Sequence, residues 1–327
     1  VLDVHPRLER IETNSQFAQI ISPSEMIAIV TISIKIGDVE GFMNICLPYI
    51  TLEPVMDKLN TKFWYSNMQE RVEMEYADTI ESLIAKAIAM GDEFHQRNIA
   101  ATLNFLKEVV PYIIALDWDR EEIQQVVEFL ANTDQFFLNV MMATGKSIAD
   151  AARKLEEGCV VTAMTRNGRN FGIRISGMGD QWFTAPVNTP KGLYFTGFCE
   201  ADGNPDIGDS AITETVGVGG MSMIAAPGVT RFVGAGGFED ALRVSNEMQQ
   251  ICITHNPNFV IPTWDFKGSP LGIDIRKVVA TGITPLINTG IAHKVAGIGQ
   301  VGAGTVRAPL GCFEKALEAY AKKLGIE

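Results

Sequence analysis

The sequence predicts a mixed α/β fold in three parts: a small αβ unit, a mainly helical region, and a larger α/β domain with short strands and glycine-rich loops. Three observations carry this prediction. Apolar residues alternate with period two near the amino terminus, the following stretch has helical but no strand patterning, and strands alternate with short helices from Gly158 onward. We therefore expect domains at 1–66, 67–157 and 158–327.

The amino-terminal unit is expected to contain a β-hairpin. Residues 26–36, MIAIVTISIKI, place apolar side chains at every even position, which is typical of a strand. Gly37-Asp38 supplies a turn, and 40–46 predicts a second strand. Thr51 then caps a short helix.

The middle part is expected to be helical. Residues 71–110 are acidic and alanine-rich in places and show no strand pattern. Asp119 and Glu122 form a capping-box pattern, which predicts a helix that runs to about Ala131. A further helix is expected over roughly 134–156.

The carboxy-terminal part combines strands and helices. Val160–Thr165 and Phe171–Ser176 flank Asn167-Gly168, a sequence that favours a tight β-hairpin turn. Further strands are expected at 193–198, 259–264 and 284–288, and helices at 239–252 and 312–324, the last ended by Gly325.

Composition narrows the class of function. The 327 residues are 46% hydrophobic and 20% charged, ordinary values for a globular protein, with a formal net charge of −12. That charge argues against a general nucleic-acid partner, since phosphate neutralisation needs clustered lysines and arginines. It leaves room for a small anionic substrate held by a few local arginines.

The cysteines predict neither a disulfide framework nor a zinc site. Five cysteines are scattered without a CxxC pair, and the chain has only four histidines. We interpret Cys159, Cys199, Cys252 and Cys312 as buried reduced thiols, which fits a cytoplasmic location. No apolar run of about 18 residues and no signal peptide is seen, so no membrane span is expected.

The stretch 204–237 is rich in glycine among small polar and charged residues. Glycine allows sharp bends and a close approach of the backbone to a ligand, which predicts a site built largely from main chain. The alternative is a set of tight turns in an α/β domain. The glycines are Gly208, Gly217, Gly219, Gly220, Gly228, Gly234, Gly236 and Gly237.

Residues Arg10–Ser66 resemble the middle domain of FliM, the flagellar motor switch protein. The resemblance rests on Asn14, Gln16-Phe17-Ala18-Gln19, Ile36-Gly37, Met43-Asn44-Ile45 and Leu52-Glu53-Pro54. It covers the second half of a CheC-like domain. The half-domain implies subunit packing in the motor switch, with motor-switch proteins as partners at the flagellar basal body and a role in chemotaxis.

From about residue 90 to the end, the chain is similar to the AllG/YlbE-type family. Motifs that carry this resemblance include GDEFHQRNIA (91–100), NPDIGDSAITET (204–215), AAPGVTRFVGAGG (225–237) and GIGQVGAGTVRAPL (297–310). The family is named for a subunit linked to oxamate carbamoyltransferase in allantoin degradation. The resemblance implies a transferase with companion subunits, and a homo-oligomer is also possible.

The two resemblances meet between Tyr65 and Met90. The family normally has a long further amino-terminal region, in whose place the FliM-like segment stands. Three origins are open: an engineered or computed chimera, an assembly error that joined two genes, or a natural fusion. The exposed sheet face that the other half of the FliM domain should cover argues against the natural fusion. A hybrid without either activity is a further alternative.

The implied chemistry is carbamoyl transfer between oxamate and a phosphate-bearing donor. Both molecules are anions, which arginine forks and backbone amides bind well. Fixed donors would stabilise the tetrahedral oxyanion, and no covalent nucleophile is required. No cofactor is expected, and a divalent metal has no clear ligand set.

Arginines near the predicted hairpin are the first candidates for substrate binding. Arg166 and Asn167 form the preferred anion-binding pair, and Arg174 lies on the returning strand. The alternative for Arg166 is that it solvates the turn. Arg231 precedes a second candidate, a loop whose amides could bind phosphate at the start of a helix near Glu239. Its glycines are Gly234, Gly236 and Gly237.

Three residues are candidate catalytic groups. His293 follows a predicted strand, where open α/β sheets place ligand contacts, and could carry a proton. His95 is expected on a helix, and Asp209 lies within the 204–215 motif. For both histidines the alternative is a structural role.

The remaining candidates for substrate binding are polar residues near glycines or strand ends. The acidic ones could orient arginines or bind a metal, and the alternative is that they cap turns and helices. They are Asp206, Thr213, Glu214, Asp265 and Asn288.

Overall fold

The computed structural model describes residues 27–36, 39–48, 80–208 and 211–326. The chain divides into two compact units, Val1–Ala77 and Asp78–Glu327. Each unit is described by itself below. Together they confirm the expected mixed α/β class.

The first unit contains one antiparallel pair of strands, β1 (Ile27–Ile36) and β2 (Val39–Pro48). The pairing runs from Ile36 opposite Val39 to Ile27 opposite Pro48, so both strands expected from the alternating pattern are confirmed. The expected turn at Gly37-Asp38 and the expected helix after Thr51 lie outside the described residues.

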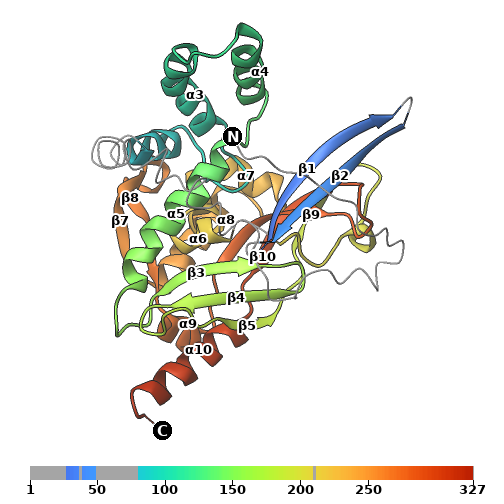
Figure 1. The fold of residues 1–327 in the computed structure, drawn as a ribbon. Helices are drawn as coiled ribbons and strands as arrows, with labels where there is room; N and C mark the ends of the chain where they lie inside the picture. The colour runs from blue at the N-terminus through green and yellow to red at the C-terminus, as the bar shows by residue number, and fades with distance from the viewer. Residues whose placement is uncertain (1–26, 37–38, 49–79, 209–210, 327) are drawn as a thin grey trace. The chain divides into compact units, whose positions relative to one another are not determined.

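The second unit begins with helices, as expected. Residues 80–89 are helical, followed by α3 (Ile99–Ile114), α4 (Arg120–Ala131) and α5 (Phe137–Arg153). The Asp119 carboxylate accepts the amides of Glu121 and Glu122, both at 2.9 Å, and so caps α4 where the capping pattern placed its start. In Figure 1, α3 and α4 form a hairpin at the top of the view.

Residues 90–98 form a loop between two helices, not part of a helix. The expectation that His95 lies on a helix is therefore wrong. Gly91 has a φ of 92° and Phe94 a φ of 69°. Such left-handed backbone interrupts a helix, so the chain turns here in spite of its helical composition.

The rest of the unit combines small antiparallel sheets with helices (Figure 1). Every strand pairing among the described residues is antiparallel, and the hairpin expected at Asn167-Gly168 is confirmed by the pairing of β3 with β4. The sheets have the orders β3-β4-β5, β6-β10-β9 and β7-β8. Their strands are β3 (Val161–Arg166), β4 (Asn170–Ile175), β5 (Phe183–Pro186), β6 (Lys191–Tyr194), β7 (Cys252–Ile261), β8 (Lys267–Ile273), β9 (Leu286–Ala292) and β10 (Gln300–Arg307).

Helices pack against these sheets: α5 and α6 on β3, and α10 on β4 and β5. Helices expected at 239–252 and 312–324 are confirmed as α8 and α10, and Gly325 has a φ of 72° after the last turn. The carboxy-terminal α-helices are α6 (Ile212–Thr215), α7 (Pro227–Phe232), α8 (Phe238–Gln250), α9 (Ile275–Thr281) and α10 (Leu310–Lys323), with 3-10 helices η1 (Glu200–Asp202), η2 (Gly219–Ala225) and η3 (Pro262–Trp264).

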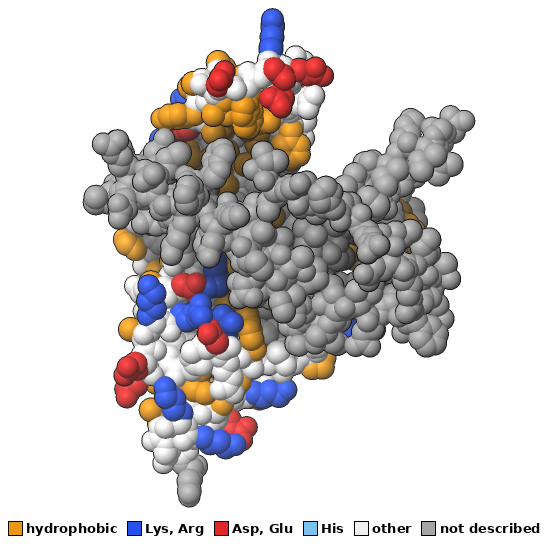
Figure 2. Space-filling model, viewed as in Figure 1, with side chains coloured by type: hydrophobic (Ala, Val, Ile, Leu, Met, Phe, Trp, Pro, Cys, Tyr) orange, Lys and Arg blue, Asp and Glu red, His pale blue; other side chains and the backbone are white. Residues whose placement is uncertain are grey.

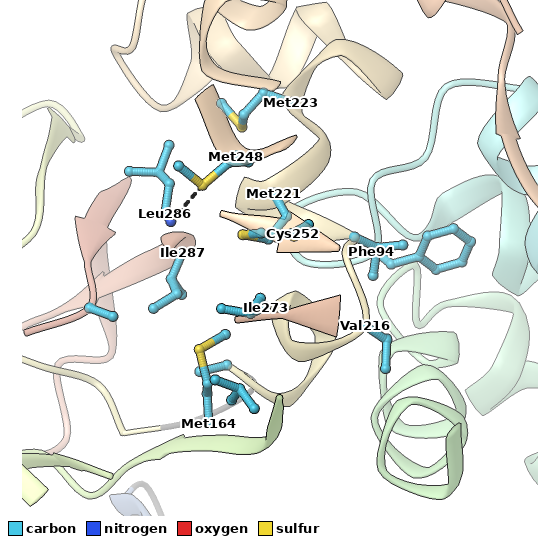
Figure 3. Packing of buried hydrophobic residues seen from close by; sticks show 14 of the residues in the cluster. Phe94, Met164, Val216, Met221, Met223, Met248, Cys252, Ile273, Leu286 and Ile287 are labelled. Carbon is cyan, nitrogen blue, oxygen red and sulfur yellow. Dashed lines mark hydrogen bonds between the residues drawn. The ribbon is translucent and has the colours of Figure 1, made fainter. Parts of the chain in front are cut away.

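One hydrophobic core joins the helical region to the sheets. Buried side chains of the same cluster come from 83–101, from α5, from η2 and from β9. Figure 3 shows Phe94, Met164, Met221 and Met248 among them. The structure therefore places the expected domains 67–157 and 158–327, as far as they are described, on a shared core.

Candidate functional site

Two neighbouring residues of β9, Asn288 and Thr289, connect two buried polar clusters. Both side chains are fully buried. Successive side chains of a strand point to opposite faces, so adjacent residues can serve different clusters. The first of the two polar clusters, the Glu93 cluster, consists of Glu93, His95, Thr213, Glu214 and Asn288. The second, the Arg166 cluster, consists of Arg166, Gly168, Asp206 and Thr289.

In the Glu93 cluster, two carboxylates are linked through His95 and Asn288. Glu214 Oε1 lies 2.7 Å from His95 Nδ1, and Glu214 Oε2 accepts a hydrogen bond from Thr213 Oγ1 at 2.7 Å. Glu93 Oε2 accepts a hydrogen bond from the side-chain Nδ2 of Asn288 at 2.7 Å. The backbone amide of Asn288 donates to Glu214 Oε1 at 3.2 Å. These five residues come from three distant parts of the sequence.

Main-chain amides complete the Glu93 cluster. Glu93 Oε1 accepts the backbone amides of residues 95, 96 and 97, and Glu214 Oε1 accepts that of Gly220 at 3.0 Å. A Cβ on Gly219 would lie 2.2 Å from Glu214 Oε1, and one on Gly220 would lie 2.3 Å from the Leu286 carbonyl oxygen. The glycines thus permit a backbone approach that a side chain would block.

Burial sets the electrostatics of this cluster. It raises the pKa of the Glu93 carboxyl above its ordinary value, although the nearby His95 ring and the hydrogen bond from Asn288 oppose the increase. The Glu214 charge raises the same pKa further. Burial therefore favours the neutral, protonated form of Glu93.

The Arg166 cluster is a buried ion pair at the end of β3. Arg166 Nη1 lies 2.9 Å from Asp206 Oδ1, and Nη2 donates to Thr289 Oγ1 at 3.1 Å. The other Asp206 oxygen accepts the Gly168 amide at 2.9 Å. Asp206 is thus joined to the β3–β4 hairpin at both carboxylate oxygens.

A surface cleft of about 480 Å³ opens beside the Arg166 cluster. Two cationic side chains, Lys146 and Arg166, line it, and none of its described lining residues is a carboxylate. Gly208 and Ile212 of the 204–215 segment form part of its wall. Each of the two cations has a carboxylate partner, Asp150 for Lys146 and Asp206 for Arg166. Asp209, a candidate catalytic residue between them, lies outside the described residues.

The structure thus brings together many of the residues expected from the sequence. His95, Thr213, Glu214 and Asn288 share the Glu93 cluster, and Arg166 and Asp206 form the ion pair beside it. Arg166 has a side chain that is only 1% exposed, so it does not solvate the turn.

Asn167 and Arg174 have local partners instead. Asn167 Oδ1 accepts the amides of Arg169 and Asn170, at 3.1 and 2.7 Å, which holds the hairpin turn. The Arg174 guanidinium stacks on the Trp182 ring at 4.4 Å, with an Nη1 atom 3.5 Å from Asp180 Oδ1.

The second glycine-rich loop carries its own carboxylate. The Gly237 amide, at the start of α8, donates to Asp240 Oδ2 at 3.0 Å. The Gly237 amide, which was expected to bind phosphate, is therefore already hydrogen-bonded to Asp240. Glu239 adds a second negative charge to the first turn of α8, which disfavours an anion there. The exposed Arg231 lies in α7, before Gly234 and Gly236.

His293 and Asp265 are placed away from the Glu93 cluster. His293 follows β9, five residues beyond Asn288, a strand distance of about 17 Å. Its Nδ1 accepts the Val295 amide at 2.9 Å, and its ring contacts Phe198. Because β9 belongs to an antiparallel sheet, the parallel-sheet argument for His293 does not apply. Asp265 lies in left-handed backbone after η3.

Three contributors were missing from the expected site: Glu93, Lys146 and Thr289. Glu93 stands two residues before His95, and Thr289 follows Asn288, so proximity to a candidate was the available signal. Lys146 lies in the middle of α5 with an ordinary i,i+4 partner, Asp150, and nothing in the sequence distinguishes it.

The cysteines correct one expectation. Cys199 is exposed, with its Sγ 3.4 Å from Asp202 Oδ2, rather than buried. Burial raises the pKa of Cys159 and of Cys312 to about 11, and that of Cys252 to about 12, so these three thiols stay protonated. Within the described ranges, no group of three or more His, Cys, Asp or Glu side chains could hold a metal ion.

Within the part of the chain that the structure describes, no helix has the length and apolar character to cross a membrane.

Two family models match the chain. The model described as oxamate carbamoyltransferase subunit AllG matches residues 55–210, and that described as flagellar motor switch protein FliM matches residues 1–64. The chain is 61% identical over 253 residues to the oxamate carbamoyltransferase subunit AllG of Escherichia coli, a match that covers 77% of this chain and 60% of that protein.

The chain is also similar to a solved structure and to FliM proteins. A crystal structure of a conserved protein of unknown function from Enterococcus faecalis V583 matches with a TM-score of 0.71 and 43% identity, over 74% of this chain and 58% of that one. The FliM of Borreliella burgdorferi is 59% identical over 66 residues, which are 20% of this chain and 19% of that protein.

The chain therefore spans about three fifths of the length of its AllG-type relative and a fifth of FliM. The glycine-rich stretch 204–237, the Glu93 cluster and the core that supports them all belong to the second unit. From these matches and this arrangement, the chain is a composite of a FliM-like amino-terminal segment and an AllG-like remainder.

Proposed function

We propose that the AllG-like part acts as a subunit of a carbamoyltransferase and binds its anionic substrate in the cleft beside Arg166. The single observation that carries this proposal is the cleft lining: Lys146 and Arg166, with no carboxylate among its described residues. The 61% identity to an oxamate carbamoyltransferase subunit supports the choice of reaction.

In the proposed reaction, the amide nitrogen of oxamate attacks the carbamoyl carbon of carbamoyl phosphate. A C–N bond forms, the bond from that carbon to the phosphate oxygen breaks, and phosphate leaves with the bonding electrons. One proton leaves the amide nitrogen. Lys146, which lines the cleft and pairs with Asp150, would attract the anions.

The buried clusters would position this site. Asp206 fixes Arg166, and Glu214 fixes the end of the 204–215 segment through His95 and Gly220. Of the candidate catalytic residues, Asp209 belongs to that segment by sequence, and we propose it as the acceptor of the proton that leaves oxamate. His95 would act through Glu214, since it is 5% exposed and does not line the cleft.

The reaction is tested with the purified chain and the companion subunits of the E. coli enzyme, by phosphate release from carbamoyl phosphate with oxamate present. Lys146→Met keeps the side-chain stem and removes the charge, and we expect KM to rise about tenfold, equivalent to about 1.4 kcal/mol. Lys322→Met, at an exposed lysine of α10, is the matched control and should leave KM unchanged.

Absence of transfer with all subunits present would exclude the reaction. Transfer that proceeds equally well in Lys146→Met and wild type would instead exclude the cleft as the substrate site, and leave the reaction standing. The two results separate the assignment of function from the assignment of site.

A second function rests on the first unit. Because residues 1–64 match the FliM model, we propose an alternative role in contacts with motor-switch proteins. Pull-down with such proteins tests it, using the full chain and a variant without residues 1–66. Equal capture by both forms would show that the FliM-like segment is not responsible.

A further inference from the structure

A second cleft, of about 580 Å³, opens between the β6-β10-β9 sheet and α8. Its volume falls within the range of about 300–1,000 Å³ that is typical of small-molecule sites. It shares no described lining residue with the proposed substrate cleft. We call it the Lys191 cleft, after a lining that includes Thr189, Lys191, Arg243, Thr305 and Arg307.

Strand pairing places three of these side chains on one side of the sheet. Lys191 of β6 lies opposite Thr305 of β10, and Arg307 follows two residues later on β10. Directly opposed residues, and residues two apart on one strand, point their side chains to the same face. Lys191, Thr305 and Arg307 therefore share a face, and α8 supplies Arg243 from outside the sheet.

The lining of the Lys191 cleft is cationic. Lys191, Arg243 and Arg307 are its charged members, and none of its described residues is a carboxylate. By contrast, the whole chain has a formal net charge of −12, and Figure 2 shows Lys, Arg, Asp and Glu side chains intermingled on the face that it draws. A concave lining with charges of one sign attracts a ligand of the opposite sign.

The two arginines of the cleft differ in how firmly they are held. Arg307 donates from Nη2 to Glu247 Oε2 at 2.8 Å and from Nη1 to the Thr284 carbonyl oxygen at 2.7 Å, so its guanidinium is fixed. Arg243 Nη2 lies 3.2 Å from Asp240 Oδ1 in an exposed i,i+3 pair. Exposed pairs of this kind are weak, so Arg243 can exchange its carboxylate for a ligand at small cost.

Lys191 leaves a positive charge uncompensated in the cleft. Among the described residues, no hydrogen bond or ion pair reaches its exposed ammonium group. The carboxylates of Asp240 and Glu247 each pair with one of the arginines, and neither lines the cleft. An anion bound between the ammonium and the guanidiniums would replace their mutual repulsion by attraction.

A phosphate group suits these donors better than a carboxylate does. It presents three strong acceptor oxygens, whereas a carboxylate presents two in one plane. Guanidiniums bind phosphate through paired N–H donors, and an ammonium adds a compact charge. The hydroxyls of Thr189 and Thr305 add further donors to the lining.

We propose that the Lys191 cleft binds a small molecule that carries a phosphate group. Arg307 is the fixed contact, and Lys191 and Arg243 are the contacts that adjust to the ligand. Because this cleft and the proposed substrate cleft have separate linings, the inference does not depend on the proposed reaction.

Calorimetric titration of the full chain tests the proposal, with inorganic phosphate, pyrophosphate and AMP as probes. We expect Lys191→Met to raise Kd about tenfold, because a charge-assisted hydrogen bond is lost while the side-chain stem is kept. Arg243→Gln should also raise Kd. Lys107→Met, at an exposed lysine of α3 outside both clefts, is the matched control and should bind as wild type. Circular dichroism checks that each variant is folded.

The probes also identify the source of the phosphate group. Tighter binding of AMP than of inorganic phosphate would support a phosphate ester as the ligand, and equal binding would support free phosphate. Oxamate serves as a carboxylate probe. Oxamate binding as tight as that of phosphate, at a site that Lys191→Met weakens, would overturn the choice of phosphate.

Lys146→Met separates the Lys191 cleft from the proposed substrate cleft. Phosphate binding that is lost in Lys146→Met but kept in Lys191→Met would overturn the proposal, as would the absence of binding by all three phosphate probes. Binding that neither Lys191→Met nor Arg243→Gln changes, or that Lys107→Met weakens equally, would also count against it, because such binding does not depend on this cleft.

Discussion

At the scale of residues, Asn288 is the link between two acids that are far apart in the sequence. Its side chain donates to Glu93 and its backbone amide to Glu214. The Asn288 Oδ1 atom has no hydrogen-bond partner in the structure and is buried. A protonated Glu93 could donate to that oxygen if the amide group were rotated, since the two ends of the amide are nearly isosteric.

The raised pKa of Glu93 predicts a definite pH dependence. The folded protein binds this proton more tightly than the unfolded chain does, so Glu93 favours folding fully below its ordinary pKa of 4.5, and the contribution is lost as the pH rises through the raised pKa. We expect the free energy of unfolding of wild type, relative to Glu93→Gln, to fall with rising pH by at most about 1.4 kcal/mol per pH unit.

Urea denaturation at a series of pH values measures this difference. Glu318→Gln is the control, because Glu318 is an exposed residue of α10 whose pKa is lowered by its hydrogen bond with Lys322. A lowered pKa gives the opposite sign: that contribution is lost as the pH falls. A wild-type to Glu93→Gln difference that stays constant or grows with pH would contradict the assignment.

The sequence identified four of the five residues of the Glu93 cluster, and it did so through the family motifs. Glu93 itself was passed over because a glutamate beside a histidine is usually a surface residue. Its burial depends on contacts with Asn288, 195 positions away, which local pattern does not reveal.

At the scale of elements, glycine made one turn predictable from the sequence and concealed one strand. The Asn167-Gly168 turn was predicted, and Gly168 has a φ of 88°. Strand β10 was not, because its glycines lack the β-branched side chains that indicate a strand. A Cβ on Gly302 or Gly304 would come within 2.5 Å of a backbone oxygen of β6, so these positions need glycine for the strands to approach.

Gly217 and Gly228 form a matched pair for testing this role. Gly217 has a φ of 87°, and a Cβ there would lie 1.6 Å from the Pro270 carbonyl oxygen. Gly217→Ala should therefore cost more than about 2 kcal/mol of stability. Gly228, in α7, has open space around it, so Gly228→Ala should be neutral or stabilising by up to about 1 kcal/mol.

Thermal or urea unfolding measures both variants. If Gly217→Ala were as stable as Gly228→Ala, the close approach of the Gly217 backbone to β8 would not be a feature of the folded protein in solution.

At the scale of the whole molecule, the second unit is held by one core rather than by separate helical and α/β cores. Phe137 of α5 is fully buried, and its ring lies 6.1 Å from that of Phe94 and 6.0 Å from that of Phe105. The same cluster includes Ile287 of β9. Loss of packing in the helices should therefore weaken the sheets.

Phe137→Ala tests this coupling. We expect it to cost about 3–5 kcal/mol, because it leaves a cavity in the core. Amide hydrogen exchange should report the loss in both α5 and β9, since both open in one cooperative transition. Phe266→Ala, at an exposed phenylalanine, should change stability by less than about 0.5 kcal/mol. Faster exchange confined to α3–α5 would instead indicate separate domains.

The sequence by itself determined the α/β class, the first hairpin, the principal helices and the composite of FliM-like and AllG-like segments, because these depend on local periodicity, capping and contiguous motifs. Only the tertiary structure decided that Glu93 joins His95 and Glu214, that Asp206 pairs with Arg166, and that His293 stands apart. Those outcomes depend on which distant segments pack together, and on burial, which sets the charge state of a side chain through surroundings that its sequence neighbours do not specify.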